Sequence, residues 1–437
     1  YSLAGRSTHH QYSTGITRQT DMSVHTLKVD VHTHILPPAE DWPDWSTKFG
    51  YGGFVRLEKP VADPSSGSEG SSSGGCGCAS SCNARMYVDQ KFFREVKPNC
   101  WDPDVRLEEL KSTGGVDVQV LSTVPVLFNY WAKGEDALET SKFINNHISS
   151  VCRAQPSRFM GLGTLPMQAP ELAVKELHRC MHDLGLVGVE IGTSVNEWRL
   201  DDPELEPFWA AADSLGAAVF VHPWDGLMNH DLLEKHWLRW LVGMPAETSM
   251  AISALVLGGV FQRHPNLRVC FAHGGGSYAM IAGRVEHGYY CRPDLVATDC
   301  NQKPHEFLGK FFVDSLVHDA DALRFLISKV GKDRVVLGSD YPFPLGEVEN
   351  TGACIEECNF DTQTLEKLMW KNCMEFLGMD EDSALSRFKG GSANDPQLVG
   401  SVAVGTKQVP NPDNSKEVEV EEQSQLEVEN PTATTGL

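Results

Sequence analysis

The sequence predicts a barrel of eight parallel β-strands with intervening helices, in a chain of 437 residues. Eight short apolar runs, rich in β-branched residues, alternate with stretches of 3.6-residue periodicity, several of which close on glycine as helix ends do. Near-continuous apolar runs are typical of parallel strands buried on both faces, and eight of them with helices between indicate a (β/α)₈ barrel of the TIM type. The runs begin at Leu27, Val116, Phe159, Leu186, Ala217, Leu267, Phe311 and Arg334.

The first two runs, LKVDVHTH and VDVQVLST, are separated by far more chain than one helix needs. We therefore expect an insertion after strand one, over about residues 36–100, with a Gly/Ser/Cys-rich loop at 64–81 that has the composition of a flexible segment. A first barrel helix is expected around Val105 to Thr113. Beyond strand two the elements alternate regularly, with helical periodicity in APELAVKELHRCMHDLG, PELEPFWAAADSLG and DADALRFLISKVGKD.

The barrel is assigned to residues 27–378, and both ends of the chain are predicted to be disordered. Residues 1–26 lack the apolar segment of a secretory signal, and Met22 is an alternative start. Residues 386–437 are rich in Gly, Ser, Asn, Pro and Glu, with Phe388 as their only aromatic residue. An acidic tail of this composition buries too little apolar surface to offset the entropy of ordering.

Composition argues against two classes of partner. The net charge is −22 and there is no cluster of Lys or Arg, whereas nucleic-acid binding needs a basic surface. The longest apolar run, Ala251 to Phe261, has 11 residues, against the roughly 20 that span a bilayer, so no membrane anchor is predicted. The 12 cysteines are spread irregularly, several within apolar or helical runs, which predicts reduced thiols and a cytoplasmic protein.

Titratable residues stand at the carboxyl ends of the predicted strands, where such barrels place their catalytic groups. His32 and His34 lie two apart on strand one, so their side chains point the same way, while His222, His273 and Asp340 end strands five, six and eight. A single buried histidine is usually a hydrogen-bonded core residue, but five titratable groups at one edge predict a metal site. The imidazoles of strands one and five with the carboxylate of strand eight suit zinc, which in catalytic sites also binds water.

Long characteristic stretches are spread over about Leu27 to Gly378. They are VDVHTHILPP, GYGGFVRL, NCWDPDVR, LSTVPVLFNYWAK, GLGTLPMQAPELAVKEL, VHPWD, WLVGMPAETSMAI, FAHGGG and GSDYPFPLGE. These stretches resemble the 2-amino-3-carboxymuconate-6-semialdehyde decarboxylase family of the amidohydrolase superfamily. The resemblance implies zinc-dependent, non-oxidative decarboxylation of 2-amino-3-carboxymuconate 6-semialdehyde to 2-aminomuconate 6-semialdehyde and CO₂, a step of tryptophan catabolism by the kynurenine pathway that limits quinolinate formation. The resemblance also implies a homodimer.

The resemblance also implies roles for individual residues. Metal ligands are implied at His32, His34, His222 and Asp340, a catalytic histidine at His273, substrate-binding arginines at Arg94 and Arg284, and pocket-lining aromatic residues at Trp240 and Phe343. Arg284 is expected to enter the active site of the neighbouring subunit. Forked guanidinium groups suit a substrate with two carboxylates, because each binds a carboxylate through two hydrogen bonds.

One zinc ion per subunit is expected. Strand four reads VGVEIGT and contains no lysine, so the carbamylated lysine that bridges two metals in binuclear amidohydrolases has no position here. Glu190 on that strand has two open interpretations, a hydrogen-bond acceptor for a metal ligand or a buried structural carboxylate.

Three other functions compete with this one. A hydrolytic mononuclear amidohydrolase would use the same metal site to attack an amide or lactone. A hydroxybenzoate decarboxylase is a second alternative, although that family tends to carry an acidic residue where this chain has His32. A catalytically inactive barrel that binds partners through its acidic tail is disfavoured by the intact set of ligand residues.

Overall fold

The structure, a computed structural model, describes residues 26–59, 83–112 and 115–389. Eight strands form one parallel sheet in the order β1-β5-β6-β7-β10-β11-β12-β13, with every predicted apolar run supplying one strand. The predicted extension at 1–26, except Thr26, and the Gly/Ser/Cys-rich loop at 64–81 lie outside the described residues. The strands are β1 Val29–Ile35, β5 Val118–Thr123, β6 Phe159–Gly163, β7 Gly188–Gly192, β10 Ala218–His222, β11 Arg268–Phe271, β12 Phe312–Asp314 and β13 Val335–Val336.

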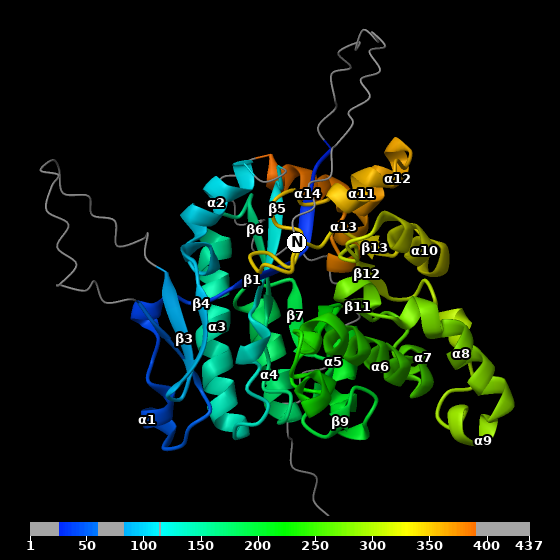
Figure 1. Ribbon diagram of the computed structural model, residues 1–437, viewed down its shortest axis with the longest axis horizontal. Coiled ribbons are helices and arrows are strands. Elements are labelled where there is room, and N and C mark those ends of the chain that lie inside the picture. The colour runs from blue at the N-terminus through cyan, green and yellow to red at the C-terminus, as the bar shows by residue number, and fades with distance from the viewer. Residues whose placement is uncertain (1–25, 60–82, 113–114, 390–437) are drawn as a thin grey trace, which may run out of the picture. The chain divides into compact units, whose positions relative to one another are not determined.

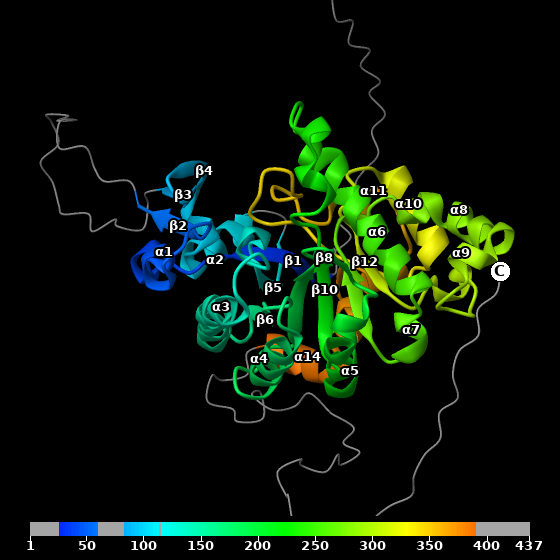
Figure 2. The same ribbon diagram turned by 90° about the horizontal axis from the view of Figure 1, so that it is seen from below.

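The sheet closes on itself between its first and last strands. Val31 N donates to Leu337 O at 2.9 Å and His34 N to Tyr341 O at 2.8 Å, which joins β1 to the segment that follows β13. We call this junction the seam. Helices surround the strands (Figures 1 and 2), so they cover the outer face of the closed sheet, and the predicted (β/α)₈ barrel is confirmed.

Several helices begin or end at caps that the sequence provides. Asp319 caps α10 by accepting from Ala322 N, and Gly216 ends α5 with a φ of 58°, a left-handed conformation that glycine adopts without strain. The helices are α1 Trp45–Phe49, α2 Pro103–Ser112, α3 Gly134–Ala154, α4 Pro170–His182, α5 Glu206–Leu215, α6 Met244–Leu257, α7 Val260–Arg263, α8 Tyr278–Cys291, α9 Pro293–Val296, α10 Ala320–Val330, α11 Ala353–Glu357, α12 Thr362–Glu366, α13 Asn372–Leu377 and α14 Glu381–Phe388.

The insertion after β1 contains a three-stranded antiparallel sheet, which the sequence analysis did not predict. Its strands are β2 Val55–Glu58, β3 Ala84–Val88 and β4 Lys91–Val96, and they lie to one side of the barrel, beside α3 (Figure 1). Buried Leu57 and Met86 share an apolar cluster with Ile35 and Leu121 of the barrel strands, so the insertion packs on the barrel. A separate short hairpin, β8 Ser194–Val195 and β9 Trp198–Arg199, follows β7.

The structure corrects the start of the predicted tail. Helix α14 continues to Phe388, and Arg387 donates to Pro156 O at 2.8 Å and Phe159 O at 3.2 Å, so residues 386–388 pack on the barrel. The prediction failed there because one helical turn with a single aromatic side chain is too short to stand out in composition. Residues 390–437 lie outside the described part of the chain.

One stretch, Arg239–Leu257, is a helix long and apolar enough to cross a membrane by length and composition, but half of it is buried. Its α6 portion buries Ile252 and Leu255 in the barrel core and also buries Glu247, as a core helix of a globular enzyme does. The cysteines of the described residues are all free thiols, as expected.

Candidate metal centre and active site

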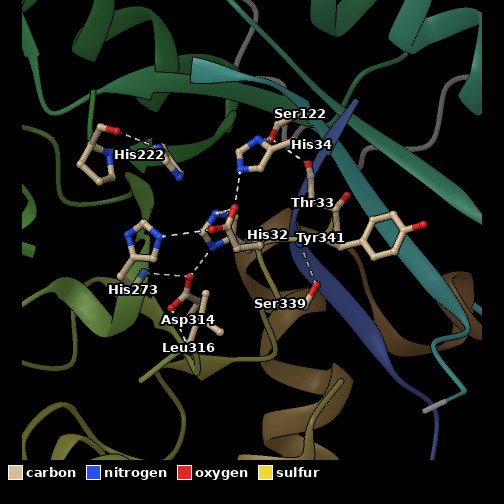
Figure 3. Close-up of polar contacts among 12 residues, drawn as sticks. His32, Thr33, His34, Ser122, His222, His273, Asp314, Leu316, Ser339 and Tyr341 are labelled. Carbon is tan, nitrogen blue, oxygen red and sulfur yellow. Dashed lines mark hydrogen bonds and ion pairs between the residues drawn. The ribbon is translucent and has the colours of Figure 1, made fainter. Parts of the chain in front are cut away.

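The predicted metal ligands converge at the carboxyl end of the barrel. His32 and His34 project from β1, His222 ends β10, and Asp340 follows β13 across the seam. One nitrogen or oxygen atom from each of these four residues lies within 4.8 Å of the others. We call these four residues the metal group; Figure 3 shows its three imidazoles turned toward a common centre.

Each imidazole of the metal group is held through Nδ1. The Nδ1 atom of His32 lies 2.7 Å from Asp314 Oδ2, that of His34 lies 2.6 Å from Thr123 O, and that of His222 lies 3.0 Å from Pro223 O. Donation from Nδ1 to an oxygen places the proton there and leaves the lone pair of Nε2 free to bind a metal. All three Nε2 atoms are buried without a hydrogen-bond partner.

A cation bound between these side chains would offset the repulsion between their facing lone pairs. The Nε2 atoms of His32 and His34 lie 3.5 and 3.1 Å from Asp340 Oδ1, so nitrogen lone pairs face a carboxylate oxygen at close range. Burial lowers the pKa of His32 and His222, which favours neutral imidazoles. Burial opposes ionisation of Asp340, but its interactions with the surrounding histidines outweigh this and hold its pKa well below the ordinary value. Three neutral nitrogens and one anionic oxygen fit a divalent metal such as zinc.

Asp314, at the carboxyl end of β12, is a functional residue that the sequence analysis missed. It binds His32 Nδ1 and also accepts from the backbone N–H groups of His273, at 3.0 Å, and Gly274, at 2.7 Å (Figure 3). Burial opposes its ionisation, yet the hydrogen bonds that it accepts from His32 and from the backbone of Gly274 hold its pKa below the ordinary value. The available signal was its place at the end of the seventh apolar run, FFVDSL, which matches the position of the other site residues.

His273 lies beside the metal group on a turn that only glycines can complete. Its Nε2 is 3.9 Å from Asp340 Oδ2, and its ring centroid is 5.1 Å from those of His32 and His222. The backbone of His273 has a φ of 55°, and the three glycines that follow also have positive φ. A Cβ atom at Gly276 would lie 2.0 Å from Pro245 O, so the turn requires glycine. The AHGGG sequence thus presents this imidazole to the site.

A small cavity adjoins the metal group and contains three more of the predicted site residues. Arg94 of β4, Trp240 and Phe343 line it together with His34, His222, His273 and Asp340. The guanidinium carbon of Arg94 lies 4.5 Å from the centre of the Phe343 ring. Trp224 and Trp237 also line the cavity and were not predicted; the VHPWD stretch next to His222 was the available signal for Trp224.

Two other predicted residues lie elsewhere. Arg284 is exposed on α8 and does not line this cavity. Glu190 is completely buried on β7, with Oε1 3.8 Å from His34 Nδ1, and burial raises its pKa well above the ordinary value. Its position is therefore beside a residue of the metal group rather than in the cavity.

Comparison with known sequences gives matches over most of the chain. The amidohydrolase family profile matches residues 29–379. A 2-amino-3-carboxymuconate-6-semialdehyde decarboxylase of Dictyostelium discoideum is 50% identical over 361 residues, covering 82% of this chain and 94% of that protein. The protein of the same name from Caenorhabditis elegans is 38% identical over 405 residues, covering 81% of this chain and 95% of that protein.

Solved structures share the fold. IDCase of Metarhizium anisopliae, in its apo form, has a TM-score of 0.64 at 22% identity, covering 80% of this chain and 97% of that one. A dihydroxybenzoic acid decarboxylase of Polaromonas sp. JS666 was solved with bound manganese and the inhibitor 2-nitroresorcinol. It has a TM-score of 0.58 at 20% identity, and the match covers 81% of this chain and 97% of that one. At these identities the likeness concerns the barrel architecture alone.

Proposed function

The chain belongs to the amidohydrolase family, and from this premise we infer that the protein is the decarboxylase of 2-amino-3-carboxymuconate 6-semialdehyde. It releases CO₂ and 2-aminomuconate 6-semialdehyde without oxidation. The observation that carries this conclusion is one cavity, in a chain half identical to a decarboxylase of that name, where the metal group, His273 and Arg94 meet. The reaction belongs to tryptophan catabolism in the cytoplasm.

The metal group holds one zinc ion. Bound there, zinc acts as a Lewis acid that provides a proton source or a nucleophile at neutral pH. The three Nε2 atoms and the Asp340 carboxylate supply its ligands, and Asp314 orients the His32 ring through the hydrogen bond to Nδ1. No lysine lies on β7 to bridge a second ion, which supports a single metal.

The side chains around the metal group account for the chemistry of decarboxylation. Arg94 binds a substrate carboxylate through its forked guanidinium and orients the molecule above the metal group. When the bond to the departing CO₂ breaks, its electron pair stays on the substrate carbon that carried the carboxylate, and that carbon must then take up a proton. His273 delivers that proton from Nε2, the ring atom that faces Asp340. Trp240 and Phe343 exclude water and pack against the planar, conjugated carbon chain.

The active enzyme is a homodimer in which Arg284 binds the substrate in the partner's site. This part of the proposal is supported by the position of Arg284 on an exposed face of α8. Met280, four residues earlier and on the same face, has 75% of its surface exposed, which is unusual for an apolar side chain that has no partner. A second guanidinium would hold the second carboxylate of the substrate.

The direct test is to add freshly generated 2-amino-3-carboxymuconate 6-semialdehyde to the zinc-loaded protein and follow its ultraviolet absorbance together with released CO₂. Loss of absorbance with stoichiometric CO₂ is expected. Absorbance loss at the rate seen without enzyme, and without CO₂, would refute the decarboxylase, and turnover of an amide or lactone instead would indicate the hydrolytic alternative. Turnover of a hydroxybenzoate but not of the semialdehyde would indicate the aromatic-acid decarboxylase.

A further inference from the structure

Arg106, on α2, is completely buried, which is rare for an arginine. Its guanidinium donates three hydrogen bonds, and all three acceptors are carbonyl or amide oxygens rather than carboxylates. Nη2 donates to His34 O and, at 3.1 Å, to Asn99 O, while Nη1 donates to Gln119 Oε1 at 3.2 Å. Burial disfavours the charged form of this side chain, so its position at this point of the fold needs a reason beyond stability.

Two of its contacts reach the segments that carry the metal group. The carbonyl oxygen of His34 belongs to a residue of that group, and Tyr341, whose ring centre lies 4.8 Å from the guanidinium carbon, directly follows Asp340. The Tyr341 ring points away from the histidines, toward the outside of the site (Figure 3). Arg106 therefore lies over the seam, on the side opposite the metal position.

The same helix binds the other end of Tyr341. Glu109, one turn after Arg106, accepts from the Tyr341 hydroxyl at 2.5 Å and from Asn99 Nδ2 at 2.9 Å. Helix α2 thus holds the tyrosine by its ring face and by its hydroxyl, and it holds Asn99 through both backbone and side chain. Because Tyr341 directly follows Asp340, these two contacts restrain the segment that carries Asp340.

Asn99 connects this network to the substrate arginine. It lies five residues after Arg94, where the insertion returns to the barrel, and the next residue, Cys100, accepts from Leu36 N at 2.8 Å. The hydrogen bond from Arg106 to Asn99 O consequently fixes the end of the segment that brings Arg94 over the metal group.

We propose that Arg106 is a positioning residue. It holds β1, the segment that follows β13 and the Arg94 segment in fixed positions relative to one another. The geometry of the ligands His34 and Asp340, and the reach of Arg94, then depend on a side chain that touches neither metal nor substrate. The substrate part of this proposal rests on the proposed function, whereas the metal part does not.

The test compares Arg106→Met, Arg106→Lys and the control Arg268→Met. Arg268 is also largely buried and donates to backbone carbonyl oxygens, those of Phe376, at 2.8 Å, and Gly216, but it begins β11 at the opposite end of the barrel. Each variant is measured for melting temperature, for the zinc dissociation constant by chelator competition without substrate, and for KM and kcat.

We expect all three variants to melt earlier, but only the Arg106 variants to bind zinc about tenfold or more weakly and to raise KM. Arg106→Lys should recover part of the zinc affinity, because an ammonium group still donates to His34 O although it covers the Tyr341 ring less well. Cobalt(II) in place of zinc should show an altered visible spectrum in Arg106→Met.

Zinc affinity and KM within twofold of wild type in Arg106→Lys, with a melting temperature lowered as in Arg268→Met, would overturn the proposal and leave Arg106 a stabilising residue only. The lysine variant decides the question if Arg106→Met does not fold. A wild-type protein that binds zinc but releases no CO₂ would refute the proposed function, while the zinc measurements would still test Arg106.

Discussion

Replacing Asp314 by asparagine changes the residue that holds His32 and leaves all four residues of the metal group in place. Each carboxylate oxygen of Asp314 accepts two hydrogen bonds. Oδ2 accepts from His32 Nδ1 and His273 N, and Oδ1 accepts from Gly274 N at 2.7 Å and Leu316 N at 3.1 Å. An asparagine has one carbonyl oxygen, so its NH₂ group must face one of these two pairs of donors. The imidazole can change tautomer and the backbone cannot, so the NH₂ group is expected to face His32.

The magnitude follows from the bonds lost. Two hydrogen bonds to an ionised carboxylate disappear, and at about 1.5–3 kcal/mol each the free energy of unfolding should fall by about 3–6 kcal/mol. An NH₂ group opposite His32 Nδ1 also favours the tautomer that carries its proton on Nε2, which removes that lone pair from the metal group. Zinc should therefore bind about 10–100-fold more weakly.

Denaturant unfolding of the metal-free protein gives the first quantity, and chelator competition gives the second. The matched control is Asp319→Asn, which changes an exposed helix cap whose side chain accepts from Ala322 N at the start of α10. Asparagine caps helices about as well as aspartate, so this variant should lose well under about 1 kcal/mol and keep its zinc affinity. An Asp314→Asn protein with wild-type zinc affinity would refute the assignment of Asp314 as the group that sets the His32 tautomer.

Three further predictions concern the metal, the dimer and the C-terminal helix. His222→Ala should lose zinc and turnover together, whereas His273→Ala should keep about one zinc ion per chain and lose only turnover; a metal-free His273→Ala protein would place His273 among the ligands. Mixing Arg284→Ala with His273→Ala chains should restore about a quarter of wild-type activity, because about half of all dimers then contain one chain of each kind and each such dimer has one intact site of two. No recovery after demonstrated subunit exchange would exclude the shared site. Ending the chain after residue 385 should lower the melting temperature, because it removes Arg387 and the two hydrogen bonds that this side chain donates to Pro156 O and Phe159 O. Ending the chain after residue 389 should leave melting temperature and activity unchanged.

The barrel and the metal group could be predicted because each depends on short-range pattern. A strand such as AVFVH shows its burial in five consecutive residues, and the fold then places His222 at a known edge. The same logic applies to Asp314, whose position at a strand end was visible although its role was not. That role depends on His32, 282 residues away in the chain, and no local pattern records such a contact.

The insertion was harder to predict for a different reason. Strands β2, β3 and β4 have four to six residues each, and in β2 buried residues alternate with half-buried ones, so their apolar alternation is too short to distinguish from a loop. Their pairing also joins segments on either side of the Gly/Ser/Cys-rich loop. The resemblance nevertheless identified Arg94, which lines the cavity in the structure, since a motif identifies a residue without describing the sheet that carries it.

The position of the metal group explains why so many buried polar contacts gather at one seam. β13 has only two residues in the sheet, so closure of the barrel there depends on few strand hydrogen bonds and on contacts such as that between Ser339 N and Asp30 Oδ1, at 3.0 Å. His32 and His34 lie on one side of the seam and Asp340 on the other, so an ion held by all three joins the first strand of the barrel to the segment after the last. An ion at a thousand times its dissociation constant stabilises the folded state by about 4 kcal/mol. Arg106 on the outside and the metal group on the inside then act on the same junction, which links the stability of the closed barrel to the geometry that binds the substrate.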